Sequence, residues 1–392
     1  MIGVRSTLDK ACKLPGKATL LCLSPISRHV VQAYIKIAKE FNTPICFATS
    51  LNQVDRGGGY TGWTPIDFKN YVMDMAREYS ISTPIILQLD HGGPWLKDEH
   101  IAKKYSYEEA LNDFLKSLEL FIKAGFDVIH IDTTIDLDSR DGYADVEVAS
   151  KRTADLIMYS EEIASRYGVK LEYEIGSDRW GYKPLEIVEN FVSKAISMLR
   201  DRGFDINRLV FGVADVGTKV CPGNRVDPVI VREFSSLMRR HGLYLKIHSG
   251  DYLENPGELP KNSVGGVNIG PMLAHIMYST FKEILYEKLD KDRALELLEE
   301  LNNFIASSDK LAKYVGKGLG EAEEYKLGLA SRYIWSTTKA KEFIDRISKI
   351  IGIDIEKLFI EKLAQTVKRY VIELNIYKLY ETNKKHATLK QY

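Results

Sequence analysis

The sequence has little that would tie it to a membrane or to nucleic acid. Its 392 residues carry 54 Lys and Arg against 54 Asp and Glu, so no net charge is available to attract nucleic acid or an anionic membrane. No apolar run approaches the roughly 20 residues of a membrane-spanning helix, and the N-terminus shows no signal-type apolar segment. These absences predict a cytoplasmic protein that binds a small molecule.

Cysteine is scarce as well. Cys12, Cys22, Cys46 and Cys221 are scattered without a CxxC pair, which argues against a disulfide framework or a thiolate zinc site. We expect them to be buried thiols of a reducing cytoplasm. The abundance of Lys, Glu, Ile and Tyr is typical of proteins from thermophiles.

What the sequence does contain is a regular alternation of short apolar runs and amphipathic helical patterns. The runs that read as strands lie at about residues 18–24, 44–50, 84–91, 127–134, 170–176, 209–215, 244–251 and 265–270. Eight strand-then-helix units predict a (β/α)8 TIM barrel, with the active site at the C-terminal ends of the strands. A doubly wound open sheet has the same alternation.

Polar residues at nearly every strand end favour the barrel over the open sheet. These residues are Ser24, Asn52, Asp90 with His91, Asp132, Glu174, Asp215, His248 with Asp251, and Asn268. Beyond residue 290 the strand signal stops and amphipathic helical patterns continue. The prediction is a barrel over residues 1–290 and a helical C-terminal extension over 291–392, packed on the barrel or on a second subunit.

Histidines and acids at these strand ends predict a metal site. His91 and His248, with Glu174 and Asp215, are the expected ligands, because zinc and related ions take imidazole nitrogen and carboxylate oxygen. Zinc is the first expectation, with manganese or cobalt as alternatives. Asp90 is the expected proton-transfer group, beside Glu174 as a second catalytic residue. The alternative is that each is a hydrogen-bonded residue of the barrel rim.

Two further interpretations concern neighbouring residues. His130 lies inside an apolar strand and is interpreted as a core or locally hydrogen-bonded residue. Glycines after the seventh and eighth strands suit a phosphate or a sugar hydroxyl, although tight turns explain them equally well. The residues expected to bind substrate are Asn52, Gln53, Asp132, Ser249, Gly250, Asp251, Asn268 and Gly270.

Several motifs together resemble a known family. They are the glycine-rich loop 52–62, Asp90-His91-Gly-Gly-Pro94-Trp95, the run 124–132, His248-Ser-Gly-Asp251-Tyr252 and Ile269-Gly-Pro271. Over about residues 15–290 the chain is similar to the accessory subunit of class II tagatose-bisphosphate aldolase, within the class II, metal-dependent aldolase superfamily. The resemblance implies chemistry on a ketose or ketose phosphate, and a catalytic aldolase subunit as a partner.

Carried over by motif, the resemblance implies that His91 and His248 bind the metal and that Glu174 lies near or on it. It also implies that Asp90 handles the carbonyl-side proton. Where the catalytic aldolases have a further histidine ligand after strand six, this chain has Asp215, which would have to bind the metal instead. Where they have a Gly-Gly-Ser phosphate grip, this chain has Ser-Gly-Asp251, and an acid there would repel a phosphate.

Three functional hypotheses follow. The first is a metal-dependent enzyme that cleaves or forms a carbon–carbon bond of a ketose, with a variant that recloses the bond on the other face and acts as a ketose 4-epimerase on an unphosphorylated sugar. The second is a non-catalytic subunit that stabilises a catalytic aldolase. The third is a sugar-binding barrel without chemistry. The retained histidines and acids favour the first, and a homo-oligomer or an aldolase partner is expected.

Overall fold

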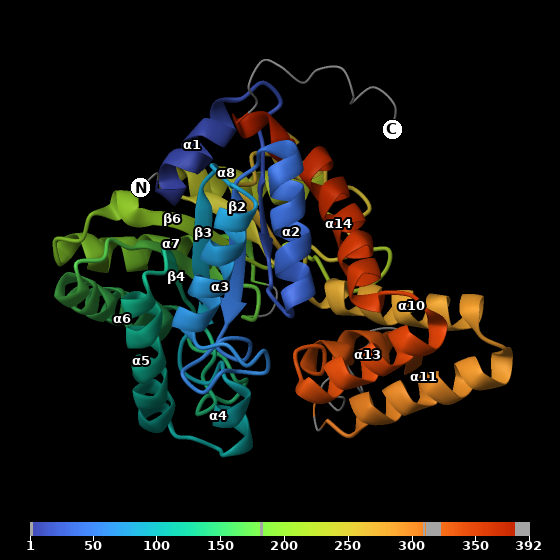
Figure 1. The fold of residues 1–392 in the computed structure, drawn as a ribbon. Coiled ribbons are helices and arrows are strands. Elements are labelled where there is room, and N and C mark those ends of the chain that lie inside the picture. The colour runs from blue at the N-terminus through green and yellow to red at the C-terminus, as the bar shows by residue number, and fades with distance from the viewer. Residues whose placement is uncertain (1–2, 181–182, 309, 311–322, 381–392) are drawn as a thin grey trace.

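Eight parallel strands close into a barrel in the order in which they occur in the chain, as the computed structural model of the protein shows (Figure 1). The description covers residues 3–180, 183–308, 310 and 323–380. Leu20 of the first strand pairs with Gly266 of the last, which closes the ring. The (β/α)8 prediction is therefore confirmed, and the open sheet is excluded. The strands are β1 (Leu20–Leu23), β2 (Ile45–Ser50), β3 (Ile85–Gly92), β4 (Val128–Ile131), β5 (Glu172–Ser177), β6 (Leu209–Ala214), β7 (Tyr244–Ile247) and β8 (Gly266–Ile269).

Amphipathic helices cover the outside of the barrel between the strands. Local sequence signals explain where they begin: Thr64 and Asp67 form a capping box for α3, and Ser106 and Glu109 form one for α5. Gly125 ends α5 in the left-handed conformation, at φ 78°. The helices are α2 (Arg28–Phe41), α3 (Pro65–Glu78), α4 (Asp98–Ala102), α5 (Tyr107–Ala124), α6 (Val146–Tyr167), α7 (Leu185–Asp201), η1 (Ile206–Arg208), α8 (Pro228–Arg240), α9 (Glu258–Lys261) and α10 (Pro271–Lys288).

One helix that the strand pattern does not predict closes the N-terminal end of the barrel. In Figure 1, α1 (Val4–Lys13) lies at the end opposite to α4. The carboxylate of Glu172 accepts hydrogen bonds from the backbone amides of Val4 and Arg5 at the start of this helix. The Arg5 guanidinium donates in turn to the carbonyl of Gly242, at 2.7 Å. Since α1 covers this end of the barrel, the opposite end, where the strands have their C-terminal ends, is the candidate for a ligand site.

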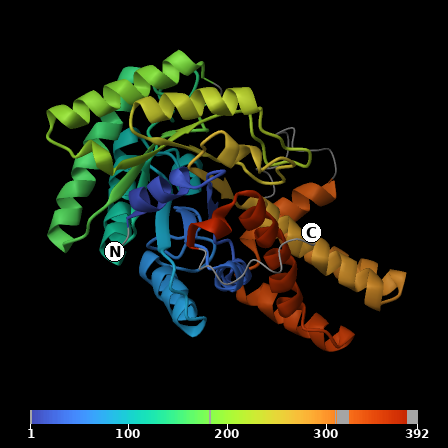
Figure 2. The same cartoon turned by 90° about the horizontal axis from the view of Figure 1, so that it is seen from above.

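The predicted C-terminal extension is helical in its described parts, residues 291–308 and 323–380, and packs on the barrel (Figure 2), whereas residues 309, 311–322 and 381–392 lie outside the described residues. It consists of α11 (Lys291–Ala306), α12 (Glu323–Ala330), η3 (Ser331–Tyr333), α13 (Thr338–Ile351), α14 (Ile355–Glu373) and η4 (Ile376–Tyr380). The Tyr370 hydroxyl of α14 donates to the carbonyl of Gly250 at 2.7 Å, and the Tyr325 hydroxyl of α12 donates to the carbonyl of Val220 at 2.9 Å. The extension therefore supports loops that follow β6 and β7 at the open end of the barrel.

A polar layer crosses the barrel interior beneath the open end. Gln88 of β3, Glu174 of β5 and Lys246 of β7 are fully buried and bonded to one another, and Lys246 Nζ lies 2.9 Å from Glu174 Oε2. Burial opposes ionisation of Glu174, but Lys246 and His130 outweigh it and lower its pKa to about 2. Alternate strands supply such layers in barrels. Glu174 is thus a fixed anion under the mouth.

Candidate metal and catalytic site

A break in the strand alternation aims two consecutive residues into the mouth of the barrel. Consecutive side chains of a strand normally point to opposite faces. The register of β3 against β4 shifts between Leu89 and Gly92, and His91 has a positive φ of 51°. Bulges of this kind re-aim side chains near active sites, and a positive φ is uncommon for histidine. Asp90 and His91 therefore both contact residues across the barrel.

Three donor atoms from three strand ends converge at this place. His91 Nε2 lies 3.0 Å from His248 Nδ1. Asp178 Oδ1 lies 3.2 Å from His248 Nδ1 and 3.5 Å from His91 Nε2. Ligand atoms at zinc distances from a tetrahedral ion lie about 3.3 Å from one another. The spacing of the three donors matches that of one metal-ligand set, which we call the outer trio.

Each histidine of the outer trio has its other ring nitrogen on a carboxylate. His91 Nδ1 lies 2.7 Å from Asp132 Oδ2, and His248 Nε2 lies 3.2 Å from Glu174 Oε1. A carboxylate in this position holds the proton on its own side of the ring. In the neutral form of each ring, the opposite nitrogen carries a lone pair that is directed at its neighbour in the trio.

The charges around the outer trio favour a positive charge among its three donor atoms. Burial opposes protonation of His248, but Asp90 and Asp178 raise its pKa well above the usual value. Burial also opposes ionisation of Asp178, yet His248 and His91 hold its pKa below the usual range. Three electron-rich atoms this close repel each other unless a proton or a cation lies among them. The donor set of two imidazoles and one carboxylate fits a divalent metal ion with an open position.

A second group of possible ligands lies deeper, made of Asp90, His130, Glu174 and His248. His130 Nδ1 accepts the backbone amide of His91 at 3.0 Å, and His130 Nε2 lies 2.8 Å from the carbonyl of Gly176. Both ring nitrogens of His130 therefore already have partners within the barrel. The interpretation of His130 as a locally hydrogen-bonded residue is confirmed, and the outer trio is the better ligand set.

Asp90 lies beside the trio and not within it. Its Oδ2 accepts a hydrogen bond from Asn268 Nδ2 at 3.2 Å, and its Oδ1 lies 3.6 Å from His248 Nε2. Burial disfavours the charged form, but His248 and His91 hold the pKa of Asp90 well below its usual range. Asp90 is therefore an ionised carboxylate at the mouth, held by an amide from β8, and is able to accept a proton.

Asp132, expected to bind substrate, instead supports His91. Its Oδ2 is hydrogen-bonded to the His91 ring and accepts from the Ser177 hydroxyl at 2.8 Å. Its Oδ1 accepts from the Thr134 hydroxyl at 2.7 Å. With 1% of its surface exposed, Asp132 has no face left for a ligand. A carboxylate in this position orients the imidazole of His91.

Asn52 and Gln53 hold loops together at the rim. Asn52 donates to the carbonyl of Leu96 at 3.2 Å and accepts from the amide of Asp98 at 2.9 Å. Gln53 Oε1 accepts from the amide of Ser50 at 2.9 Å. These contacts tie the loop after β2 to the loop after β3. Substrate binding by either residue stays a prediction.

The loop after β7 carries three more of the expected residues, Ser249, Gly250 and Asp251. Asn224, which ends the Pro222-Gly-Asn224 motif after β6, donates to the carbonyls of Ser249 and Asp251 at 2.8 and 2.7 Å. The carboxylate of Asp251 is buried and accepts from the amide of Gly270 at 3.0 Å. The motif after β6 therefore fixes the loop that follows His248 on the next strand.

The structure does not bring Asp215 to the histidines. Its carboxylate accepts the amide of Gly217 at 2.8 Å, and among the described residues it belongs to none of the groups that could hold a metal. Asp178 stands in its place. A signal for Asp178 exists in the sequence, because residues 174, 176 and 178 share one face of an extended segment by period two. Sequence reasoning missed it because the predicted strand ended at Gly176.

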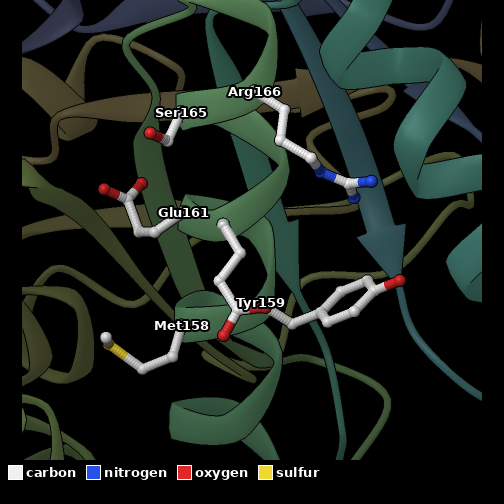
Figure 3. A pocket seen from close by; sticks show the side chains of 6 residues that line it. Met158, Tyr159, Glu161, Ser165 and Arg166 are labelled. Carbon is white, nitrogen blue, oxygen red and sulfur yellow. The ribbon is translucent and has the colours of Figure 1, made fainter.

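A surface pocket elsewhere in the molecule lacks this chemistry. It lies on the outer helix α6 and is lined by Met158, Tyr159, Glu161, Glu162, Ser165 and Arg166 (Figure 3). Glu161 is already paired with Arg208 and with the Tyr173 hydroxyl. The barrel mouth is therefore the better candidate. Within the described residues, none of the helices combines the length and the apolar character needed to cross a membrane.

Comparison with known proteins confirms the resemblance noted in the sequence. Residues 8–179 match the family described as D-tagatose-1,6-bisphosphate aldolase subunit GatZ/KbaZ-like. The matched stretch runs from α1 through β5 and contains Asp90, His91, Asp132, Glu174 and Asp178. Aldolase-type function is the broad class that this match supports. His248 lies beyond the matched residues.

Solved structures share the fold over nearly the whole chain. A protein from Sinorhizobium meliloti 1021, described as a probable tagatose 6 phosphate kinase, is 22% identical over 93% of this chain and 100% of its own, with a TM-score of 0.69. A fructose-bisphosphate aldolase from Campylobacter jejuni is 14% identical over 96% of this chain and 95% of its own, with a TM-score of 0.53. At these identities the likeness concerns the fold alone.

Proposed function

We propose, on the premise that residues 8–179 match a tagatose-bisphosphate aldolase subunit family, that this chain is a divalent-metal-dependent enzyme of aldolase type. It cleaves or forms a carbon–carbon bond of a ketose or ketose phosphate. The observation that carries the proposal is the outer trio, in which His91, His248 and Asp178 direct donor atoms at one point. Zinc suits two imidazoles and one carboxylate, with manganese or cobalt as alternatives.

The proposed chemistry divides the work between the metal and Asp90. A divalent ion bound to the outer trio supplies Lewis-acid polarisation of a substrate oxygen. Asp90, as an ionised carboxylate, takes the proton of the hydroxyl group that becomes the aldehyde carbonyl when the adjacent carbon–carbon bond breaks. In the reverse direction it returns that proton. Asn268 holds Asp90 in place, and Glu174 and Asp132 keep the imidazoles oriented.

A second candidate is a non-catalytic subunit of a catalytic aldolase, because the matched family is described as an aldolase subunit. A purely structural subunit has no physical need for two imidazoles and a carboxylate gathered within 3.5 Å of one another at the mouth of a barrel. The enzyme therefore accounts for more of the observed geometry than the scaffold does.

The deciding experiment is turnover by the chain purified alone. Free and phosphorylated fructose and tagatose are incubated with protein that is untreated, chelated, or chelated and reloaded with zinc, manganese or cobalt. We expect conversion that is lost on chelation and restored by one of the metals. Triose products identify the lyase, and exchange between fructose and tagatose identifies the 4-epimerase. A metal-loaded chain that converts none of these sugars alone, but raises the activity of a catalytic aldolase, contradicts the proposal in favour of the subunit.

A further inference from the structure

The N-terminus of α10 lies where many barrels bind phosphate. Barrel enzymes use backbone amides of the loops after the seventh and eighth strands, together with a helix N-terminus, for this purpose. In this chain α10 begins at Pro271, directly after β8 and Gly270. Proline has no amide hydrogen, so Gly270, Met272 and Leu273 carry the donors of this turn.

Asp251 already accepts hydrogen bonds from two of these donors. Its Oδ1 accepts the amides of Gly270 and Met272 at 3.0 and 2.8 Å. The amide of Leu273 is bonded to the carbonyl of Gly270 at 2.9 Å. With 1% of its surface exposed, Asp251 is enclosed by the elements it joins. The carboxylate therefore stands where a phosphate oxygen would bind.

Hydrogen bonds fix the loop that carries Asp251, so the carboxylate cannot move aside for a phosphate. The amide of Gly250 donates to the carbonyl of Asn268 at 2.9 Å, and the carbonyl of Gly250 accepts the Tyr370 hydroxyl at 2.7 Å. A Cβ atom added at Gly250 would collide with the Val267 side chain. The backbone amide that could grip a phosphate here is thus used within the barrel.

The charge of Asp251 also disfavours binding of a phosphate. Burial raises its pKa to about 6, against the lowering effect of the amides of Met272 and Gly270. The carboxylate is therefore mainly ionised at neutral pH, and it would repel a phosphate dianion brought against it.

The neighbouring strand offers an acceptor and not a donor. Asn268 is 6% exposed, and its Nδ2 is committed to the carboxylate of Asp90 at 3.2 Å. Its Oδ1 is buried without a hydrogen-bond partner. A buried acceptor without a partner is costly. A hydroxyl group of a ligand can donate to it, whereas an ionised phosphate cannot.

We infer that Asp251 and Asn268 make the β7–β8 side of the mouth specific for a substrate end that carries a free hydroxyl group and not a phosphate. The inference rests on the proposed function, since it concerns the sugar bound at the same mouth. It excludes a 1,6-bisphosphate, which places a phosphate at each end. Unphosphorylated ketoses, or ketoses phosphorylated only at the other end, remain as the substrate class.

The test is calorimetric binding to the zinc-loaded full chain of fructose and tagatose, their 1- and 6-phosphates, and their 1,6-bisphosphates. We expect the best bisphosphate to bind at least about tenfold more weakly than the best of the other ligands, because like charges brought together at a binding site are strongly unfavourable. Tightest binding of a bisphosphate, or no saturable binding of any of the sugars, overturns the inference. Since binding needs no turnover, an inert chain that shows the expected order contradicts the proposed function alone.

Variants assign the effect to the two residues. Asp251→Ser removes the carboxylate and Asp251→Asn removes only its charge, so both should reduce the discrimination against the bisphosphate, the Ser variant more. Asp290→Ser, which removes an Asp that caps α11, is the matched control and should leave the order of affinities unchanged. Asn268→Ala should weaken binding of the free ketose. If correctly folded Asp251→Asn keeps the full discrimination, Asp251 is not its source.

Discussion

Two networks of histidine and aspartate in this protein differ in the cations that balance their carboxylates. In the mouth, Asp178 is paired with His91 and His248. In the second network, which we call the rim network, Asp113 contacts Lys97 at 2.7 Å and His100 at 3.0 Å. The same residue types thus occur in both places with different cations.

The rim network also contains Arg56, bonded to Asp113, and Asp55, whose Oδ2 lies 2.7 Å from Lys97 Nζ. Two carboxylates therefore face two permanent cations, and His100 is free to stay neutral. In the mouth, the buried Lys246 is already paired with Glu174. The rim network is balanced by permanent cations, whereas the mouth depends on a protonated histidine or on a bound cation, and this difference makes the mouth the candidate for a metal.

The largest effect should come from the histidines of the mouth. His91→Ala and His248→Ala each remove a donor atom, and we expect activity to fall by about 10²-fold or more because a mononuclear site rarely survives the loss of one of three ligands. The readout is turnover of the converted ketose at saturating zinc. His100→Ala in the rim network is the matched control: it should lower the melting temperature and keep metal and turnover. Equal loss of turnover in all three variants would remove the distinction between the networks.

Asp90→Asn separates proton transfer from metal binding. The amide cannot take a proton, and we expect kcat to fall by about 10²- to 10⁴-fold while metal content is unchanged. Rates are compared with metal content measured on the same preparation. Full activity of the metal-loaded variant would exclude Asp90 as the base.

Asp132→Asn tests the support of His91 from behind. Because the carboxylate fixes the ring through a 2.7 Å contact, its loss should weaken metal affinity by about 10- to 100-fold without abolishing binding. Competition with a fluorescent zinc chelator measures this change. Unaltered affinity would mean that Asp132 serves the fold and not the metal.

Much of the frame was predictable from sequence, because strand length and apolar character are local properties. All eight strands and the mouth position of Asp90, His91 and His248 follow from such signals. Asp178 was not found, since it reaches the histidines from the segment just beyond its strand. The sequence predicted that an acid at position 251 would repel a phosphate, but not its hydrogen bonds to Gly270 and Met272, because these partners lie across a loop, at the start of α10.

In the rim network the expected effect is on stability. Lys97→Met leaves Asp55 and Asp113 without their shared cation, and breaking a buried ion pair costs about 3–5 kcal/mol. We therefore expect a lower denaturation midpoint with unchanged metal content. Chemical denaturation of the metal-loaded protein provides the value. Loss of the metal from the folded variant would show that the two networks are coupled.

The smallest effect is a dependence of that stability on pH. Burial opposes ionisation of Asp113, but hydrogen bonds from Lys97 and His100 lower its pKa from 3.8 to about 2. A lowered carboxyl pKa stabilises the fold at pH above the unfolded value and is lost as pH falls through the folded value. The difference between wild type and Lys97→Met should therefore shrink between about pH 4 and pH 2. A difference that stays constant over this range contradicts the assignment.

The central claim is that His91, His248 and Asp178 form a metal site, and metal content tests it most directly. The chain, Asp178→Ala and Asp215→Ala are purified alone, loaded with zinc, dialysed and analysed by mass spectrometry of the metal. The account predicts about one zinc per chain in the wild type and in Asp215→Ala, and strongly reduced zinc in Asp178→Ala. Zinc that is absent from the wild type, or lost from Asp215→Ala and retained by Asp178→Ala, would contradict it.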